Sequence, residues 1–196
     1  MRSEKGMILR LPEIKHITYD EFVSIDKNTH ELLEYIDGIV YNQASPSKTH
    51  QIVALNIATE FNIFFRNKEC KPFIAPFDIV LKNEKEQYPK KVIPDISIIC
   101  DKTGLSDVNY TGVPTLIVEI LSPSNESHDL VTKMNLYQRF GVNEYWIVNP
   151  KIRSVSIYKI NEESFYEQFG VYKNEEEFES ATFKELKINL REIFEV

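Results

Sequence analysis

Two carboxylates stand inside apolar segments, where a charged group is expensive to bury. Asp95 lies at the centre of the segment 92–98, and Glu119 interrupts the apolar run 115–121. Burial of a carboxylate costs free energy unless the group is paired or bound to a metal ion. Two adjacent buried strands that each deliver one carboxylate form a site of hard oxygen ligands, which suits Mg²⁺ or Mn²⁺. We therefore predict a metal site at Asp95 and Glu119, with the backbone carbonyl of Ile120 as a third ligand.

Such a metal supports the hydrolysis of phosphodiester bonds, because it polarises the phosphate and lowers the pKa of an attacking water. Catalysis also gains from a cation that positions the water and offsets the developing charge. Lys133 is the candidate for this role, because it follows Glu119 on a predicted helix, one face of which carries Asp129, Lys133 and Tyr137. The alternative for Lys133 is an exposed helix lysine that pairs with Asp129 one turn earlier.

Two further residues are candidates for the same site. Glu34 lies on a predicted hairpin strand, from which it would join the acidic cluster or orient Lys133; otherwise it faces solvent. His50 lies in the first turn of a predicted long helix, from which it would contact a substrate phosphate or a metal-bound water; otherwise it caps its own helix. The two metal carboxylates also have an alternative, which is to accept hydrogen bonds from loop N–H groups.

The elements that must position these residues alternate along the chain. Asp37-Gly38 supplies the positive φ of a two-residue turn, which predicts a hairpin over residues 34–41. Apolar spacing and run length predict the other elements: a short capped helix after residue 18, a long helix opened by residues 45–47, strands at 73–81, 91–100, 115–121 and 144–148, a helix at 127–140 closed by Gly141, an edge strand at 154–160, and a final turn or helix at 190–194. Because strands and helices interleave, the predicted class is α/β, with a mixed central β-sheet flanked by helices.

The bulk properties of the chain limit the classes to which it can belong. Its 196 residues, 42% of them hydrophobic, suit one domain with a buried core. Cys70 and Cys100 form no metal-ligand pattern, so we expect both to be reduced and mostly buried, as in a cytoplasmic protein. No apolar stretch is long enough for a membrane helix, and residues 1–15 lack the apolar core of a secretory signal.

The charge is unevenly distributed. A net charge of −7 is unusual for a protein that binds DNA, because such proteins are usually basic. Glutamates crowd the segment 161–185, where they predict a solvated face. Basic residues gather elsewhere, and one group of lysines predicts a local surface that contacts nucleic acid: Lys82, Lys85, Lys90 and Lys91.

The ordered motifs over roughly residues 18–160 resemble the Uma-two family of restriction-endonuclease-like proteins, within the PD-(D/E)xK nuclease superfamily. The motifs are Pro94-Asp95, Val118-Glu119-Ile120-Leu121-Ser122-Pro123-Ser124, Lys133-x-x-x-Tyr137 and Gly141-Val142-x-Glu144-Tyr145-Trp146-Ile147-Val148-x-Pro150, preceded by Glu34, Asp37-Gly38, Ser45-Pro46 and His50-Gln51. The resemblance implies a restriction-endonuclease-like fold, a divalent metal and cleavage of nucleic acid. One departure from the superfamily pattern is Leu121, which fills the usual lysine position two residues after Glu119; the lysine is then expected on the following helix, as Lys133.

The sequence therefore predicts a single PD-(D/E)xK nuclease-like domain over residues 1–196, with a short N-terminal extension and an acidic C-terminal region. The predicted activity is a Mg²⁺- or Mn²⁺-dependent endonuclease that hydrolyses phosphodiester bonds in DNA, with Asp95, Glu119, Lys133 and Glu34 as catalytic residues. One alternative is a catalytically inactive nuclease-fold module that binds nucleic acid or a protein, and another is an RNA nuclease. A homodimer is compatible with this reading, because superfamily nucleases that cut both strands often pair.

Overall fold

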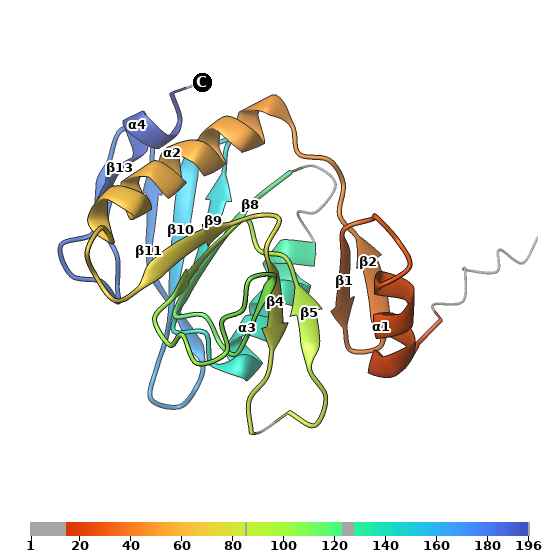
Figure 1. The fold of residues 1–196 in the computed structure, drawn as a ribbon. Coiled ribbons are helices and arrows are strands. Elements are labelled where there is room, and N and C mark those ends of the chain that lie inside the picture. The colour runs from red at the N-terminus through yellow and green to blue at the C-terminus, as the bar shows by residue number, and fades with distance from the viewer. Residues whose placement is uncertain (1–14, 85, 123–127, 196) are drawn as a thin grey trace, which may run out of the picture.

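The computed structural model describes residues 15–84, 86–122 and 128–195 (Figure 1). They form a six-stranded sheet in the order β11-β10-β9-β8-β6-β3, a five-stranded sheet in the order β2-β1-β5-β4-β7, and a small β12-β13 hairpin. Helices cover the larger sheet, so the predicted α/β class is confirmed. No helix among these residues is long and apolar enough to cross a membrane.

The six-stranded sheet carries the core of the molecule. Its strands are antiparallel except for β8 and β9, which run parallel. Their bounds are β3 (Lys71–Ile74), β6 (Ile96–Ile99), β8 (Leu116–Ile120), β9 (Glu144–Asn149), β10 (Ser154–Ile160) and β11 (Tyr166–Lys173). All five residues of β8 are buried, as expected for a central strand that is covered on both faces.

Two helical layers cover the two faces of this sheet. Helix α2 (Lys48–Phe64), capped by the Ser47 side chain, buries Val53, Ile57 and Phe61 against one face. On the other face, the π-helical turn η1 (His128–Lys133) leads into α3 (Met134–Phe140). Gly141 then ends this helix at a φ of 83°, a left-handed conformation that glycine adopts without strain. The predicted helix start at residue 127 lies outside the described residues.

The five-stranded sheet, which includes the N-terminal β1–β2 hairpin, lies beside the larger sheet. Helix α1 (Tyr19–Asp26) begins with a Thr18 capping box. Asp37 and Gly38 have φ values of 50° and 87°, which confirms the predicted turn. The strands are β1 (Leu33–Ile36), β2 (Ile39–Asn42), β4 (Asp78–Leu81), β5 (Lys90–Val92) and β7 (Asn109–Thr111).

The two sheets are joined by strands that were each predicted as one element. The predicted strand 73–81 is divided into β3 and β4, and the predicted strand 91–100 is divided into β5 and β6. Pro76 stands in the first break and Pro94 in the second, and proline has no N–H to donate to a sheet ladder. The chain therefore passes from one sheet to the other at these points, and Asp95 lies at the second break.

The C-terminal region differs from one expectation and agrees with another. Strand β10 was predicted as an edge, but β11 pairs along its length and forms the edge instead. The glutamates of this region are exposed, as expected for a solvated face. Its apolar residues nevertheless complete the core under α2, through β12 (Glu177–Glu179), β13 (Lys187–Asn189) and the predicted final helix α4 (Leu190–Ile193).

The cysteine prediction was wrong. Cys70 and Cys100 form a disulfide, and both are partly buried. Strands β3 and β6 pair with Lys71 opposite Ile99, so the next residues outward, Cys70 and Cys100, face each other at a Cα–Cα distance of 4.0 Å. A separation of 30 residues in the sequence hid this pairing. The inference of a cytoplasmic location from reduced cysteines therefore has no support.

Candidate active site

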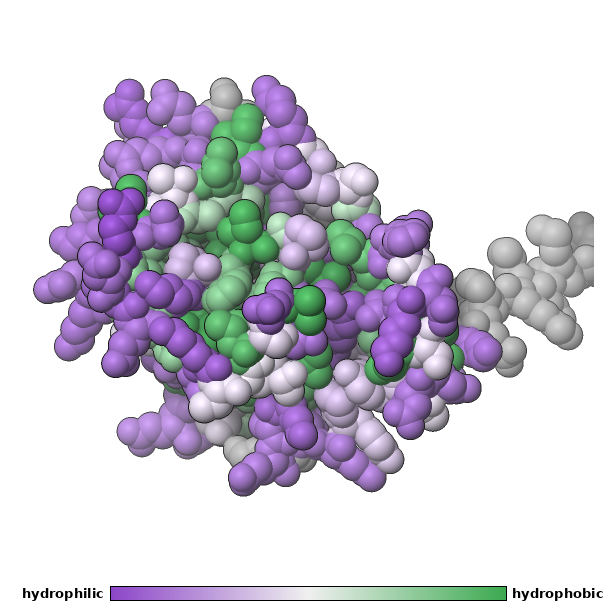
Figure 2. All heavy atoms as spheres, in the orientation of Figure 1, coloured by the Kyte–Doolittle hydropathy of each residue, from purple (hydrophilic) through white to green (hydrophobic). Residues whose placement is uncertain are grey.

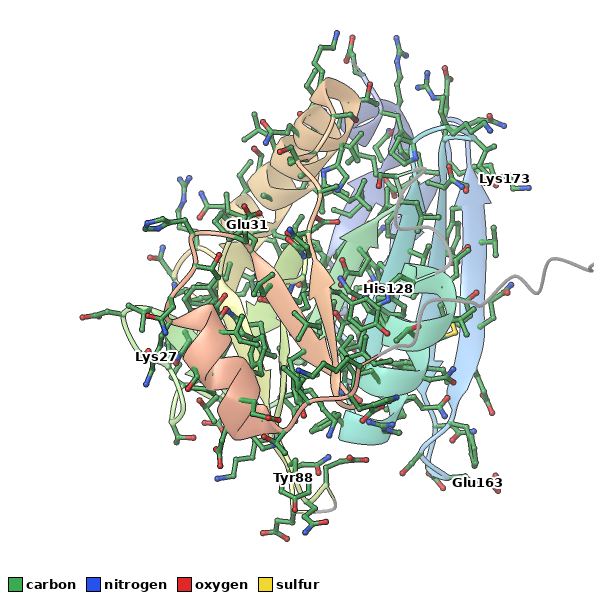
Figure 3. The ribbon with its side chains drawn as sticks, turned by 90° about the vertical axis from the view of Figure 1, so that its right-hand side faces the viewer. Lys27, Glu31, Tyr88, His128, Glu163 and Lys173 are labelled. Atoms are coloured by element: carbon green, nitrogen blue, oxygen red, sulfur yellow. A yellow bond between two sulfur atoms is a disulfide. The ribbon has the colours of Figure 1, made fainter. Side chains whose placement is uncertain are left out.

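A cleft of about 860 Å³ opens between α2, the β1–β2 hairpin, the end of β8 and η1. One side is apolar, because Leu32, Leu55 and Ile74 line it and remain substantially exposed; Figure 2 shows hydrophobic side chains on the face that α2 and β3 present. The other side carries charge. Glu34, His50, Asp95, Glu119, His128 and Lys133 all line it. In Figure 3, Glu31 and His128, two lining residues, lie on the face turned to the viewer.

Asp95 is fixed by two contacts at one oxygen. The Ile120 backbone N–H donates to Asp95 Oδ2 at 2.7 Å, and His50 Nε2 lies 3.1 Å from the same oxygen. His50 is able to do this because it is in the first turn of α2, where its backbone N–H donates to Ser47 Oγ. Ser47, not His50, therefore caps α2, and the His50 ring contacts the predicted metal carboxylate. A contact between His50 and a substrate phosphate or metal-bound water stays a prediction.

Lys133 lies at the centre of the charged side. Its ammonium Nζ is 3.0 Å from Glu119 Oε1 and 3.1 Å from Glu34 Oε1, and its side chain is only 3% exposed. The helix that follows β8 thus returns Lys133 to the carboxylate of that strand, and the reading of Lys133 as an exposed helix lysine is wrong. The Tyr137 hydroxyl also donates to Glu119 Oε1, at 2.6 Å.

Glu34 is buried rather than solvent-facing. Its Oε1 accepts the Ile93 backbone N–H at 2.8 Å and the Gln43 side-chain amide at 3.3 Å, in addition to its contact with Lys133. Burial by itself would raise the pKa of Glu34. The Lys133 charge, the nearby His128 ring and the Ile93 N–H outweigh burial and hold the pKa at about 2. Glu34 is therefore ionised at any ordinary pH and balances the charge of Lys133.

Sequence reasoning missed three contributors to this site. Gln43 links Glu34 to the Ile93 carbonyl, 2.8 Å from its amide nitrogen. His128 stacks near Tyr41 at a centroid distance of 4.2 Å, and its Nε2 lies 3.5 Å from Glu34 Oε2. Tyr137 is fully buried in the core, and its hydroxyl donates a hydrogen bond to Glu119. Of these three residues, only Tyr137 could have been predicted from the sequence to belong to the site, because it shares a helix face with Lys133.

The oxygen ligands in the cleft meet some of the requirements of a divalent cation such as Mg²⁺. Asp95 and Glu119 line one cleft, although no cluster of three or more His, Cys, Asp or Glu residues suited to a metal occurs within the described ranges. Apart from the histidines, the described charged residues that line the cleft are four carboxylates, Glu31, Glu34, Asp95 and Glu119, and one lysine, Lys133, which leaves an excess of negative charge. Mg²⁺ commonly binds through one or two carboxylates and retains several waters, so this excess and this donor number are compatible with it.

The backbone offers a third oxygen. Val118 pairs with Ile96 in the β6–β8 ladder, so continuation of the ladder would set Ile120 opposite Pro94. Pro94 has no N–H to donate to the Ile120 carbonyl, and the Ile120 N–H turns to Asp95 instead. The interrupted ladder is therefore consistent with the Ile120 carbonyl as a metal ligand.

The predicted lysine surface is largely wrong. Lys91 is buried between Asp26 and Asp78, and Lys90 is buried near Asp37 and Glu86. Desolvation opposes the charge of Lys91, but its two carboxylate partners raise its pKa above the ordinary value. Lys82 is exposed, and Lys85 lies outside the described residues. Lysines that are committed to internal ion pairs cannot also neutralise phosphates.

The low pKa of Glu34 makes a prediction about acid stability. The ordinary pKa of a glutamate is 4.5, and Glu34 in the folded protein titrates at about 2, so the unfolded chain binds more protons between these values. Glu34 then stabilises the fold by about 3 kcal/mol above pH 4.5, and this contribution disappears as the pH falls towards 2. The difference in unfolding free energy between wild type and Glu34→Gln should shrink across this range in denaturant titrations. A difference that stays constant with pH would contradict the assigned environment.

Comparisons with known proteins show the fold and the family of this chain. The crystal structure of a "putative nuclease belonging to DUF820" from Anabaena variabilis ATCC 29413 has the same fold, with a TM-score of 0.74 and 19% identity, over 91% of this chain and 97% of that one. The protein slr1290 of Synechocystis sp. (strain ATCC 27184 / PCC 6803 / Kazusa), described as uncharacterized, is 26% identical over 145 residues, which are 74% of each chain. The Uma2 family, described as "Putative restriction endonuclease", matches residues 19–191. The chain therefore belongs to the Uma2 family of restriction-endonuclease-like nucleases.

Proposed function

We propose that the protein is a divalent-metal-dependent endonuclease that hydrolyses phosphodiester bonds, with DNA as its substrate. One observation carries the proposal: the buried Lys133 ammonium bridges Glu119 and Glu34 in the cleft that Asp95 also lines. A cation held beside two strand-borne carboxylates is what metal-assisted phosphoryl chemistry requires. Membership in a nuclease family supports the same reaction class.

Asp95, Glu119 and the Ile120 carbonyl would hold Mg²⁺ or Mn²⁺. When bound, such an ion polarises the phosphate and lowers the pKa of water. The chain's own residues prepare this site before any metal arrives. The Ile120 N–H and His50 fix the Asp95 carboxylate, and Tyr137 and Lys133 fix that of Glu119. Side chains held in this way pay little reorganisation energy when the ligand enters.

Lys133 would act on the substrate. Its ammonium offers positive charge to the phosphate oxygens as negative charge develops on them, and it orients the attacking water. Glu34 would act through Lys133: as an anion 3.1 Å from the ammonium, it would hold Lys133 in place beside Glu119. Leu121 cannot supply this charge from the usual position, so Lys133 would carry the role alone.

A direct assay tests the proposal. We expect the wild-type protein to cleave a supercoiled plasmid or labelled oligonucleotides in the presence of Mg²⁺ or Mn²⁺, and EDTA should abolish the cleavage. Single- and double-stranded RNA should be cleaved more slowly than DNA. Binding without any cleavage, under every metal condition, would instead support the inactive binding module. Faster cleavage of RNA would reassign the substrate while keeping the reaction.

A further inference from the structure

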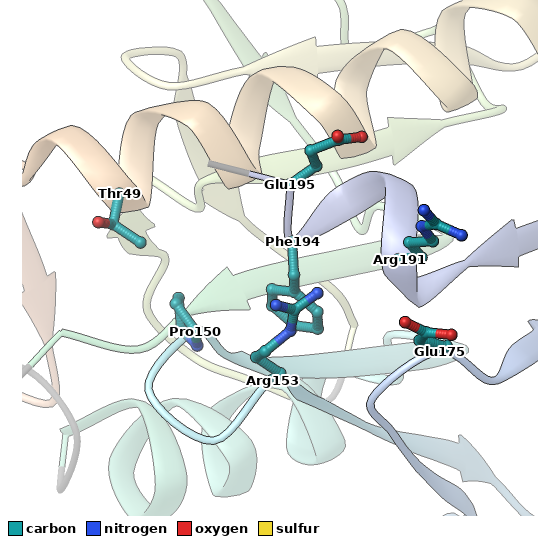
Figure 4. Close-up of a pocket in the computed structure, with 7 residues that line it drawn as sticks. All are labelled: Thr49, Pro150, Arg153, Glu175, Arg191, Phe194 and Glu195. Atoms are coloured by element: carbon teal, nitrogen blue, oxygen red, sulfur yellow. The ribbon is translucent and has the colours of Figure 1, made fainter.

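A second hollow, of about 520 Å³, lies beside the cleft at the same end of the six-stranded sheet (Figure 4). Its walls come from the first turn of α2, the turn between β9 and β10, and the C-terminal helix α4. Two arginines line it, Arg153 from the β9–β10 turn and Arg191 from α4. Glu175, Glu195 and Phe194 complete most of the lining. No part of the proposed active-site chemistry uses these residues.

The two arginines form no ion pair among the described residues. Neither guanidinium has a carboxylate or hydrogen-bond partner within the described part of the chain, which separates them from Arg139, held by Asp37 and Glu86. Both are exposed. The Arg153 guanidinium lies 6.0 Å from the centre of the Phe194 ring, a distance at which the ring face attracts a cation. Figure 4 shows Arg153 beside this ring in the hollow.

The hollow adjoins the cleft through consecutive residues. Thr49 lines the hollow, and the next residue, His50, lines the cleft and contacts Asp95. The parallel pairing of β8 with β9 sets Ile120 beside Val148, so Pro150, which lines the hollow, follows two residues beyond the strand position next to the site. A polymer strand lying in the cleft would therefore continue over Arg153 and Arg191 if it left past the start of α2.

We propose that Arg153 and Arg191 together bind a backbone phosphate of the nucleic-acid strand, one that flanks the phosphate at the cleft; this rests on the proposed nuclease function. A guanidinium presents two parallel N–H donors that match phosphate oxygens, and it cannot lose its charge near neutral pH. The internal ion pairs of Lys90 and Lys91 withdraw these two lysines from contact with nucleic acid. The cleft itself is acidic and repels a polyanion. A cationic contact beside the cleft would therefore hold the nucleic acid while one of its phosphates reacts.

The carboxylates in the hollow provide a second test of the proposal, because they should affect binding in the opposite direction. Glu175 and Glu195 offset the positive charge of the two arginines, so they weaken the contact with a phosphate. Removal of the Glu175 charge should then strengthen binding, whereas removal of the arginine charges should weaken it. Opposite effects from neighbouring residues are hard to produce by general damage to the fold.

Binding measurements with the full chain in EDTA, where no cleavage occurs, test the proposal. Fluorescence anisotropy with labelled single-stranded and duplex DNA should give a Kd about tenfold weaker for the double variant Arg153→Gln/Arg191→Gln, as expected for loss of one charged hydrogen-bonded contact. The slope of log Kd against log salt should fall by about 1. The variant Glu175→Gln should bind about twofold to threefold tighter, since a like charge near a phosphate is removed.

Controls make substitutions of the same type elsewhere on the surface. Arg66→Gln removes an exposed arginine just beyond the far end of α2, and Glu163→Gln removes an exposed glutamate at the opposite end of β10 and β11 (Figure 3). Neither control should alter the Kd or the salt slope. If the arginine double variant matches Arg66→Gln in both quantities, or if Glu175→Gln matches Glu163→Gln, the proposed phosphate contact is wrong.

A small substrate separates this proposal from the nuclease function. Bis(p-nitrophenyl) phosphate has one phosphodiester and no flanking phosphate, so the arginine double variant should hydrolyse it with Mn²⁺ at the wild-type rate. Wild-type hydrolysis of this ester without measurable binding of DNA or RNA would overturn the flanking contact and leave the hydrolase intact. A wild type that does neither would overturn both.

Discussion

Replacement of Lys133 with Ala is expected to lower the rate of DNA cleavage by about 100-fold, the low end of what one positioned electrostatic or acid–base group contributes. The Lys133 ammonium is 3.0 Å from Glu119 Oε1, within the cleft, and within the described residues no other lysine lines that cleft. Affinity for Mn²⁺ should not fall and should rise slightly, because a competing positive charge leaves the carboxylates. Cleavage kinetics and Mn²⁺ calorimetry on the same preparations measure both effects.

The buried position of Lys133 requires controls for stability. Removal of one partner from a buried ion pair costs about 3–5 kcal/mol, so Lys133→Ala should also melt at a lower temperature. Lys133→Gln retains a hydrogen-bond donor without the charge, and it should lose as much activity with a smaller loss of stability. Lys133→Arg should rescue little, because a planar guanidinium does not fit a slot shaped for an ammonium. Wild-type cleavage rates in folded Lys133→Ala or Lys133→Gln would remove Lys133 from the catalytic machinery.

Replacement of Asp95 with Asn should have the larger effect, a loss of cleavage of about 1000-fold, at the upper end for removal of one electrostatic group. Asn keeps an oxygen that accepts the Ile120 N–H, now at 2.7 Å from Asp95 Oδ2, so the fold should survive. The negative charge that attracts the metal is gone, and Mn²⁺ binding by calorimetry should weaken by at least about tenfold.

Asp101→Asn is the matched control for this prediction. Asp101 lies shortly after the end of β6, the strand that begins directly after Asp95, and it is exposed and accepts the Thr103 N–H. This control should bind Mn²⁺ and cleave DNA as the wild type does. Equal binding heats for wild type and Asp95→Asn would show that the metal, if any, binds elsewhere.

Local signals predicted much of the fold. The Asp37-Gly38 turn, the helix that Ser47 caps and the buried strand around Glu119 are all present as expected, because each depends on neighbours in sequence. The mixed α/β class follows from the order of these elements. The division of two predicted strands between two sheets was not foreseen, since apolar runs continue through Pro76 and Pro94 and hide the change of partner.

The parts of the site that were missed depend on contacts between distant segments. Gln43 and Ile93 are 50 positions apart, yet they meet at Glu34. The Cys70–Cys100 disulfide follows from strand register, which composition does not reveal. Lys90 and Lys91 were read as a basic surface because their carboxylate partners are remote in sequence. Single-domain organisation, homodimer formation and a role for Mg²⁺ stay predictions.

The position of the metal tests the central claim most directly. Crystals soaked in Mn²⁺ and measured at the manganese absorption edge should show one anomalous peak in the cleft, at about 2.2 Å from oxygens of Asp95 and Glu119 and from the Ile120 carbonyl, with Lys133 Nζ facing it without coordinating. The absence of a peak there, under conditions in which the protein cleaves DNA with Mn²⁺, or a peak coordinated by other residues, would contradict the proposed active site.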